Sequence, residues 1–300
     1  MRIFVQSATA VITALLLAAC GGGGDSGSSS SSSSSSTTTS RAILTTPAGT
    51  ACANDFGNTD AFGNITFQVS QPVGAQAWNC LVVNGNTLIP TVSGTQSVRF
   101  EVRPGDCNGN SPPSTYTDCG NDRSRYELMA NPNYSTQGQI ITYEYYVYIP
   151  SQPLIRPATA KGASQTTVMF ISQIDNMNQT GTSKFVLFYL AIDESGGLYL
   201  SPQKGFASIN DTPVVIDSNP ANKWIKMKYV IKSTSADDGY VQVYANDKLV
   251  LNQTRATLPS SDYHILLKVG IYNAFLSAAA SAYDTQVVFF DGFSTSVTNF

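Results

Sequence analysis

The sequence has little of three things on which many active sites depend: charge, histidine and soft metal ligands. Only 12% of its 300 residues are charged and the formal net charge is -3, so no basic stripe or tail is available for nucleic acid. The single histidine is His264, and the nucleophile motif G-x-S-x-G is absent, which argues against a serine hydrolase. We expect no nucleic-acid partner, and an anionic ligand would require a local cluster of Arg and Lys.

The chain also lacks an apolar run long enough to span a membrane in the mature protein. Met1-Arg2 precede a short hydrophobic region from Ala8 to Ala19, which is typical of a secretion signal over residues 1–19. Its end, Leu17-Ala18-Ala19-Cys20, resembles the bacterial lipobox, in which the cysteine is acylated; an ordinary signal peptide is the alternative. Gly21 after Cys20 resembles the outer-membrane sorting rule. We expect a bacterial outer-membrane lipoprotein, periplasmic or surface-facing, held to the membrane only by its lipid anchor.

Residues 20–41 are mostly glycine, serine and threonine, including the serine run from Ser28 to Ser36. Such a segment cannot bury apolar surface, so it is expected to be a flexible tether. A tether of about 20 residues has a root-mean-square span of roughly 25 Å. We expect one folded domain over residues 42–300, and a monomer.

Without Cys20, the number of cysteines is even, as is typical of disulfides in an exported protein. They are Cys52, Cys80, Cys107 and Cys119. Three pairings are possible. We favour Cys52–Cys80 and Cys107–Cys119, since the second pair would close the Gly/Pro/Ser-rich loop 108–118.

Oxidised thiols and one histidine leave few soft ligands, so we expect no metal and no cofactor. The cluster Asp106–Asn110 has oxygen ligands that would suit a structural calcium ion. A polar turn is the favoured interpretation of the same residues.

Beyond residue 60, short β-rich segments alternate with Gly, Asn, Asp, Ser and Pro, and no long helical periodicity occurs. This pattern predicts an all-β, two-sheet β-sandwich, a jelly roll. Tyr240–Leu251 is predicted to be a hairpin with a turn at residues 245–247. The predicted strands are Ile65–Val69, Ser97–Arg103, Ile140–Ile149, Thr167–Ile174, Phe185–Ile192, Trp224–Ile231, Tyr240–Tyr244, Lys248–Leu251, Tyr263–Tyr272 and Gln286–Phe290.

The segment Leu267–Asn273 is predicted to be a strand with one apolar face and one face that carries the polar side chains of a lysine and a tyrosine. Side chains alternate in a strand, so Lys268, Gly270 and Tyr272 point one way and the leucine, valine and isoleucine between them point the other. Two other segments alternate charged residues in the same way, Ser97–Arg103 and Asp122–Leu128. The charged residues are Arg99, Glu101 and Arg103 in the first, and Arg123, Arg125 and Glu127 in the second.

Arginines so placed suit an acidic ligand, because a guanidinium matches both oxygens of a carboxylate. Opposite charges with this spacing can equally pair on a solvated face, and both interpretations stay open. Tyr146 and Tyr148 share the side of Glu144 and could line a groove, although strand tyrosines more often pack in the core.

Three motifs resemble, in the same order, blocks of the jelly-roll alginate lyases: R-x-E-L, Q-I-H and K-A-G-x-Y-N. Here they read Arg125-Tyr126-Glu127-Leu128, Gln173-Ile174-Asp175 and Lys268–Asn273. Other stretches resemble the heparin-lyase-I-like polysaccharide lyases, namely Ser97–Asp106, Asn121–Leu128, Lys223-Trp224 and Asp238–Lys248. Together the resemblances span most of residues 95–293. They imply a jelly roll of the concanavalin A-like lectin and glucanase type.

The resemblance implies an acidic polysaccharide as partner and β-elimination at C4 of a uronic acid. That chemistry must neutralise the C5 carboxylate, remove the C5 proton and protonate the departing O4. It implies proton transfer by Tyr272, with Arg125 and Gln173 stabilising the carboxylate. A free tyrosine has a pKa of about 10, so it needs nearby cations to act as a base. The expected substrate-binding residues are Lys268, Arg123, Arg99, Tyr146 and Asn176.

The sequence departs from the family pattern at Asp175, where the histidine of Q-x-H is expected. An ionised aspartate would repel the carboxylate, so Asp175 must be protonated, turned away or engaged with an arginine, with Asn176 or Asn178 as substitutes for the histidine. His264 has the parity of Tyr272 but lies eight residues away, roughly 26 Å along a strand. We interpret His264 as a surface or subsite residue.

Without a histidine, Tyr272 would serve as both base and acid, which suits a uronate whose C5 hydrogen and O4 leave from the same side. Glucuronate and mannuronate have that stereochemistry. Two rivals remain. A glycoside hydrolase would need the E-x-D-x-x-E strand of related glucanases, which is absent. A carbohydrate-binding outer-membrane lipoprotein without catalysis is the stronger alternative, because the change at Asp175 would accompany lost activity.

Overall fold

The computed structural model describes residues 48–49, 51–52, 67–70, 72–89, 91–109, 115–130, 134–150, 168–192, 195–203, 212–274, 276 and 284–300. All of them belong to one unit, residues 39–300. The predicted signal peptide and tether, with Cys20, lie outside the described residues. Within those residues, no helix has the length and hydrophobicity needed to cross a membrane.

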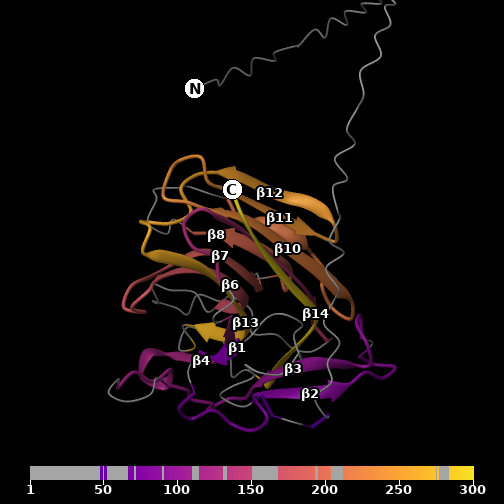
Figure 1. Ribbon diagram of the computed structural model, residues 1–300. Helices are drawn as coiled ribbons and strands as arrows, with labels where there is room; N and C mark the ends of the chain where they lie inside the picture. Colours follow the sequence, from indigo (N-terminus) through magenta and orange to yellow (C-terminus); the bar gives the residue numbers. More distant parts are fainter. Residues whose placement is uncertain are drawn as a thin grey trace, which may run out of the picture. The chain divides into compact units, whose positions relative to one another are not determined.

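Two antiparallel sheets of seven strands each make up the described domain (Figure 1). Sheet A has the order β12 (Lys248–Thr254), β11 (Tyr240–Ala245), β10 (Trp224–Ser233), β5 (Gln139–Tyr148), β14 (Gln286–Asn299), β3 (Gln96–Val102) and β2 (Cys80–Asn84). Sheet B has the order β1 (Phe67–Val69), β4 (Arg123–Ala130), β13 (Tyr263–Ala274), β6 (Val168–Asn178), β7 (Lys184–Ile192), β8 (Leu198–Pro202) and β9 (Val214–Asp217). The predicted all-β, two-sheet sandwich is confirmed.

Strand alternation explains why these segments pack as two layers. In β10, every second residue is buried along the whole strand, as expected for a strand with one face on the core. The core between the sheets includes large side chains such as Tyr145 and Phe290, whose ring centroids lie 5.6 Å apart. The Tyr145 hydroxyl contacts Ser172 Oγ of β6 at 2.6 Å, which ties sheet A to sheet B.

Strands β2, β8 and β9 were not predicted, and β4 was noted only for its alternating charges. All three missed strands have five residues or fewer, too short for a clear pattern. The structure also extends β14 to Asn299, nine residues past the predicted end. Its Ser- and Thr-rich second half pairs with β5 along the whole length, so a partner strand overrides a weak local preference.

The predicted hairpin is confirmed, and its turn consists of Asn246 and Asp247. Both residues have positive φ angles, 47° and 65°, as a two-residue hairpin turn requires. The structure contains both favoured disulfides, Cys52–Cys80 and Cys107–Cys119.

Candidate active site on the outer face of sheet B

The face of sheet B that points away from sheet A carries most of the predicted site. Tyr126 and Leu128 of β4 and Val269 and Ile271 of β13 belong to the core. The residues between them therefore point outward. Strand register then places outward residues of β4, β13 and β6 side by side, because β13 lies between the other two. We call this surface the outer face of sheet B.

Tyr272 lies between two arginines of β4. The Nε of Arg123 donates a hydrogen bond of 2.7 Å to the phenol oxygen. The guanidinium of Arg125, the direct register partner of Tyr272, lies over its ring at 4.0 Å from the centroid. Phe170 contacts the ring from the β6 side, with centroids 5.3 Å apart. The phenol oxygen therefore has a charged donor, and a second cation lies against the ring.

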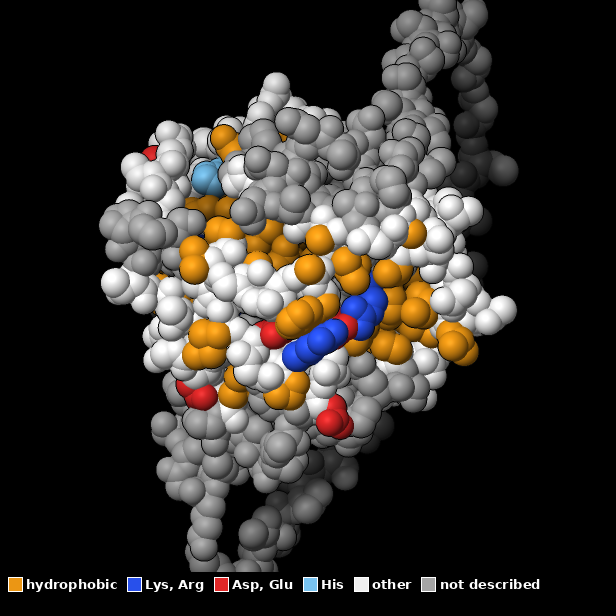
Figure 2. Space-filling view, turned by 90° about the horizontal axis from the view of Figure 1, so that it is seen from below, with side chains coloured by type: hydrophobic (Ala, Val, Ile, Leu, Met, Phe, Trp, Pro, Cys, Tyr) orange, Lys and Arg blue, Asp and Glu red, His pale blue; other side chains and the backbone are white. Residues whose placement is uncertain are grey.

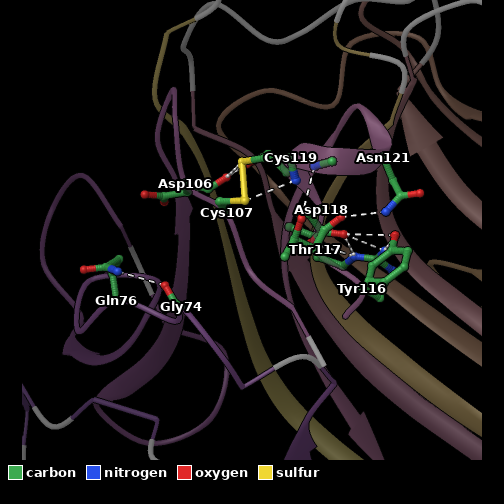
Figure 3. The surroundings of a disulfide bond; sticks show 12 residues. Gly74, Gln76, Asp106, Cys107, Tyr116, Thr117, Asp118, Cys119 and Asn121 are labelled. Carbon is green, nitrogen blue, oxygen red and sulfur yellow. Dashed lines mark hydrogen bonds and ion pairs between the residues drawn. A yellow bond between two sulfur atoms is a disulfide. The ribbon is translucent and has the colours of Figure 1, made fainter. Parts of the chain in front are cut away.

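The loop that the Cys107–Cys119 disulfide closes carries Tyr116 and Asp118 (Figure 3), and both side chains hold Arg125. Its Nε and Nη2 donate to the carboxylate of Asp118 at 2.7 to 3.0 Å, and Nη2 also donates to the Tyr116 hydroxyl at 2.7 Å. Burial alone would lower the pKa of Arg125, but Asp118 and Glu127 outweigh it and raise that pKa. Arg125 is thus a permanent, immobilised cation beneath Tyr272.

Gly270 lets the backbone of β4 approach β13 closely beside Tyr272. A Cβ atom there would lie 2.2 Å from the carbonyl oxygen of Tyr126, and its φ of +141° disfavours any other residue. Gln173 of β6 donates a hydrogen bond from Nε2 to Oε1 of Glu127 on β4. An amide and a carboxylate thus meet across the middle strand, β13.

Asp175 is held by two lysines. Its Oδ2 lies 3.1 Å from Nζ of Lys184 and 3.5 Å from Nζ of Lys268. Burial opposes protonation of Lys184, but Asp175 and Glu127 raise its pKa. Burial and the charge of Lys184 lower the pKa of Lys268, whose Nζ also donates to Ser70 Oγ at 3.3 Å. The aspartate is therefore engaged, as expected, but with lysines rather than an arginine.

The site gathers charges of both signs. Among the described residues these include the cations Arg123, Arg125, Lys184 and Lys268, and the carboxylates Asp118, Glu127 and Asp175. On the face of the molecule that Figure 2 shows, Lys and Arg side chains gather in one short strip with acidic side chains beside it, and most of the described surface is uncharged.

Three predicted binding residues lie elsewhere. Arg99 is on β3 and Tyr146 on β5, both in sheet A, where Arg99 pairs with Glu101. Asn176 has the opposite parity to Asp175, is buried, and donates to the Thr257 carbonyl oxygen at 3.2 Å. Sheet assignment and parity thus separate all three from Tyr272.

Sequence reasoning missed Lys184, Asp118 and Tyr116. Lys184 begins β7, whose register with β6 brings it near Asp175, and no local motif signals that pairing. Asp118 directly precedes Cys119, so its place was detectable only if the disulfide was assumed. Tyr116 Oη also donates to Asp118 Oδ1 at 3.2 Å.

In the cluster that could have held calcium, Asp106 uses its carboxylate for hydrogen bonds within the protein. Oδ2 of Asp106 accepts hydrogen bonds from Asn79 Nδ2 at 2.8 Å and from the Arg103 amide at 2.9 Å. Asn110 lies outside the described residues. Within the described part of the chain, no three residues of His, Cys, Asp and Glu gather as metal ligands.

Comparison with known proteins places the chain in a family. The family model described as polysaccharide lyase matches residues 76–294. The endo-β-1,4-glucuronan lyase from the fungus Trichoderma reesei has 14% identity and a TM-score of 0.52, covering 82% of this chain and 94% of that one. An alginate lyase of polysaccharide lyase family 7, AlgAT5, has 15% identity and a TM-score of 0.44, covering 67% and 78%.

No curated protein matches the sequence. The family match does not single out the heparin-lyase-I-like members, so that finer resemblance is not confirmed. The fungal structure shares the two-sheet fold. The family model covers well over half of the chain, and the chain therefore belongs to the polysaccharide lyases, carbon–oxygen lyases that act on polysaccharides.

Proposed function

We propose that this protein cleaves a uronate-containing polysaccharide by β-elimination on the outer face of sheet B, with Tyr272 as the residue that moves the proton. The observation that carries the proposal is the Tyr272 oxygen, which accepts a hydrogen bond from Arg123 while Arg125 lies against its ring. The phenol thus lies among cationic groups, as expected for a tyrosine that transfers a proton next to an acidic substrate.

In the proposed step, Tyr272 takes the proton from C5, and the electron pair of that bond forms the C4–C5 double bond. The C4–O4 bond breaks, and O4 receives the same proton from Tyr272. Atoms and charge balance without a cofactor. The products are an unsaturated uronate and a chain with a new hydroxyl end.

The site supports the remaining task, which is neutralising the substrate carboxylate. Arginine, lysine and amide donors gathered at one place suit a uronate carboxylate. Gln173 and Lys268 are register partners on β6 and β13, on the same outer face as Tyr272. Arg125 has three protein partners already, so we assign it to supporting Tyr272, with the carboxylate received by Gln173, Lys268 and Arg123.

Asp175 stands where the family has histidine, and its two lysine contacts keep its charge paired. With no histidine at this position, base and acid would be the same tyrosine, which favours glucuronate or mannuronate over guluronate. The fungal relative is a glucuronan lyase, which supports glucuronan as the first polymer to test.

The test is an ultraviolet assay for unsaturated uronate on glucuronan, polymannuronate, polyguluronate and heparin. We expect product from glucuronan or polymannuronate, and Tyr272→Phe should lower kcat by about 10²–10⁴-fold. Tyr146→Phe, a matched change in sheet A, should leave kcat unchanged. Turnover only on polyguluronate would contradict the shared-tyrosine step, and equal activity of Tyr272→Phe would contradict the role of Tyr272.

The second candidate is a carbohydrate-binding protein without turnover, which the change from histidine to Asp175 favours. Under this alternative, the wild-type chain and Tyr272→Phe would bind acidic oligosaccharides equally and neither would release product. Calorimetric titration beside the ultraviolet assay separates the two functions.

We further propose that Cys20 is acylated after removal of residues 1–19, and that the monomeric domain stands off the outer membrane on its tether. Support comes from the lipobox-like sequence and the composition of residues 20–41. Labelling with a radioactive fatty acid should mark the wild-type protein and not Cys20→Ser. Equal labelling of both would contradict the anchor.

A further inference from the structure

A hollow of about 350 Å³ lies at the opposite end of the outer face of sheet B from Tyr272. Its floor consists of Met129, Met177 and Leu266, from β4, β6 and β13. These are the three strands that carry Arg125, Gln173 and Tyr272. The hollow and the proposed active site are therefore two parts of one surface.

Strand register shows how close the two parts are. Met129 in the floor is the register partner of Lys268 in the active site. Along β13, His264 in the wall lies about 13 Å from Lys268 and about 26 Å from Tyr272, at roughly 3.3 Å per residue. A chain of several linked sugars that occupies the active site can thus extend into the hollow.

One wall of the hollow is a pair of rings. Tyr134 and His264 have centroids 4.3 Å apart and planes at 34°. The adjacent residues Ser135 and Ile265 exchange two backbone hydrogen bonds of 2.8 and 3.1 Å, which hold Tyr134 beside β13. Flat rings of this kind are the usual contact for the apolar face of a sugar.

The opposite wall is the turn between β6 and β7, from Asn178 to Gly181. The Asn178 side chain donates to Thr180 and Thr182 at 2.9 and 3.0 Å and accepts from the Ser183 amide at 2.9 Å. Gly181, with a φ of +71°, closes the turn. The wall is thus fixed in advance, and it presents hydroxyl and amide groups rather than charges.

The hollow differs from the active site in its charge. Its described lining contains no Asp, Glu, Lys or Arg. Its only imidazole is His264, whose pKa is lowered by burial, so it is neutral at neutral pH. A carboxylate here would lose water without gaining a cation from this lining, which is unfavourable. Uncharged hydroxyl groups have suitable partners in the turn.

We propose that this hollow binds an uncharged pyranose ring of the same polysaccharide chain whose uronate reaches Tyr272. The substrate that fills both parts of the surface is then a mixed polymer of uronate and uncharged sugars, whereas a uronate homopolymer would occupy the active site alone. This inference rests on the proposed function, because it assumes that the outer face of sheet B holds an acidic polysaccharide.

The test uses octasaccharides of glucuronan, hyaluronan and deacylated gellan; the last two contain uncharged sugars between glucuronates. Tyr272→Phe serves as the background, because it keeps the hollow and prevents cleavage. Adding Tyr134→Ala should weaken calorimetric binding of at least one mixed octasaccharide about tenfold and change glucuronan binding less than about twofold. Tyr134→Phe should retain the affinity, and Tyr244→Ala, which removes a ring from sheet A, is the control.

The single histidine supplies a second readout. An uncharged ring in the hollow should shift the NMR signal of the His264 imidazole without raising its pKa, whereas a carboxylate beside it would raise that pKa. A raised pKa with both mixed probes, equal loss for all three probes, or no binding of either mixed probe would overturn the inference. Absence of lyase product with binding that still depends on Tyr134 would instead overturn the proposed function alone.

Discussion

Residues 99–103 and 123–127 carry almost the same pattern, three charges on alternate positions of a strand, and the structure uses them in opposite ways. Arg99 of β3 and Arg103, the residue after its end, both pair with Glu101 of β3, and the Arg103 side chain is 45% exposed. In β4, the Arg125 side chain is 8% exposed and its partners Asp118 and Tyr272 come from other segments.

Both strands lie second from a sheet edge, so their place in the sheet does not explain the difference. Glu101 is buried between two arginines that stay partly exposed, at 24% and 45% of their side chains. Arg125 also pairs with Glu127 of its own strand, but Asp118 and Tyr116 of the disulfide-closed loop and Tyr272 of β13 contact it as well and bury it. The arginine with partners from other segments belongs to the site, and the arginines paired within one strand do not.

The largest expected effect comes from removing a buried partner. Asp175→Leu leaves Lys268 buried without its carboxylate, and should lower the free energy of unfolding by about 3–5 kcal/mol. Asp238→Asn breaks the exposed pair with Lys232 in sheet A, and should cost less than about 1 kcal/mol. Urea unfolding measures both. The double variant Asp175→Leu/Lys268→Met should recover much of the loss; no recovery would refute the buried pair as its cause.

The second-largest effect on activity is expected from a pair of conservative changes, one in the charged segment of β4 and one in that of β3. Arg125→Lys cannot reproduce the forked contact with Asp118 or the stacking on Tyr272, so kcat/KM should fall by about 10²-fold. Arg99→Lys keeps a charge beside Glu101 and should leave kcat/KM within about twofold. Steady-state assays on the best polymer measure both. Equal effects would remove the distinction between the two strands.

The two disulfides are also expected to differ: one supports activity as well as stability, and the other supports stability alone. Replacing Cys107 and Cys119 by serine frees the loop that holds Asp118, and should lower kcat about tenfold, besides costing roughly 3 kcal/mol of stability. Replacing Cys52 and Cys80 should cost similar stability and leave kcat nearly unchanged for the folded fraction. Activity per folded molecule is the measure, and a larger kcat loss in the second variant would contradict the assignment.

The smallest effect concerns pH and His264. Burial lowers its folded-state pKa below 6.5, so the unfolded chain takes up the proton first as pH falls. This contribution to stability is complete above pH 6.5 and declines below it. His264→Gln should therefore flatten the difference in unfolding free energy between about pH 7.5 and about pH 5, by less than roughly 1 kcal/mol. A larger change in the free energy of unfolding with pH in the variant would contradict the assigned direction of the pKa shift.

Local sequence predicted most strands, the hairpin and the disulfides, because alternation and turn chemistry act over a few residues. It placed Tyr272 and Arg125 correctly as neighbours through the order of the motifs. It failed for Arg99 and Tyr146 because strand parity indicates a face and not which sheet carries it. Lys184 was missed because its pairing with Asp175 depends on the register of β6 and β7.

Because the Cys107–Cys119 disulfide closes the loop that holds Arg125, the geometry of the site depends on the oxidation state of these two cysteines. In a reducing environment the cysteines would remain thiols, and the loop that holds Arg125 would not be closed by a covalent bond. Full activity would then be reached only after oxidation closes the loop, in line with the lower kcat expected without this disulfide.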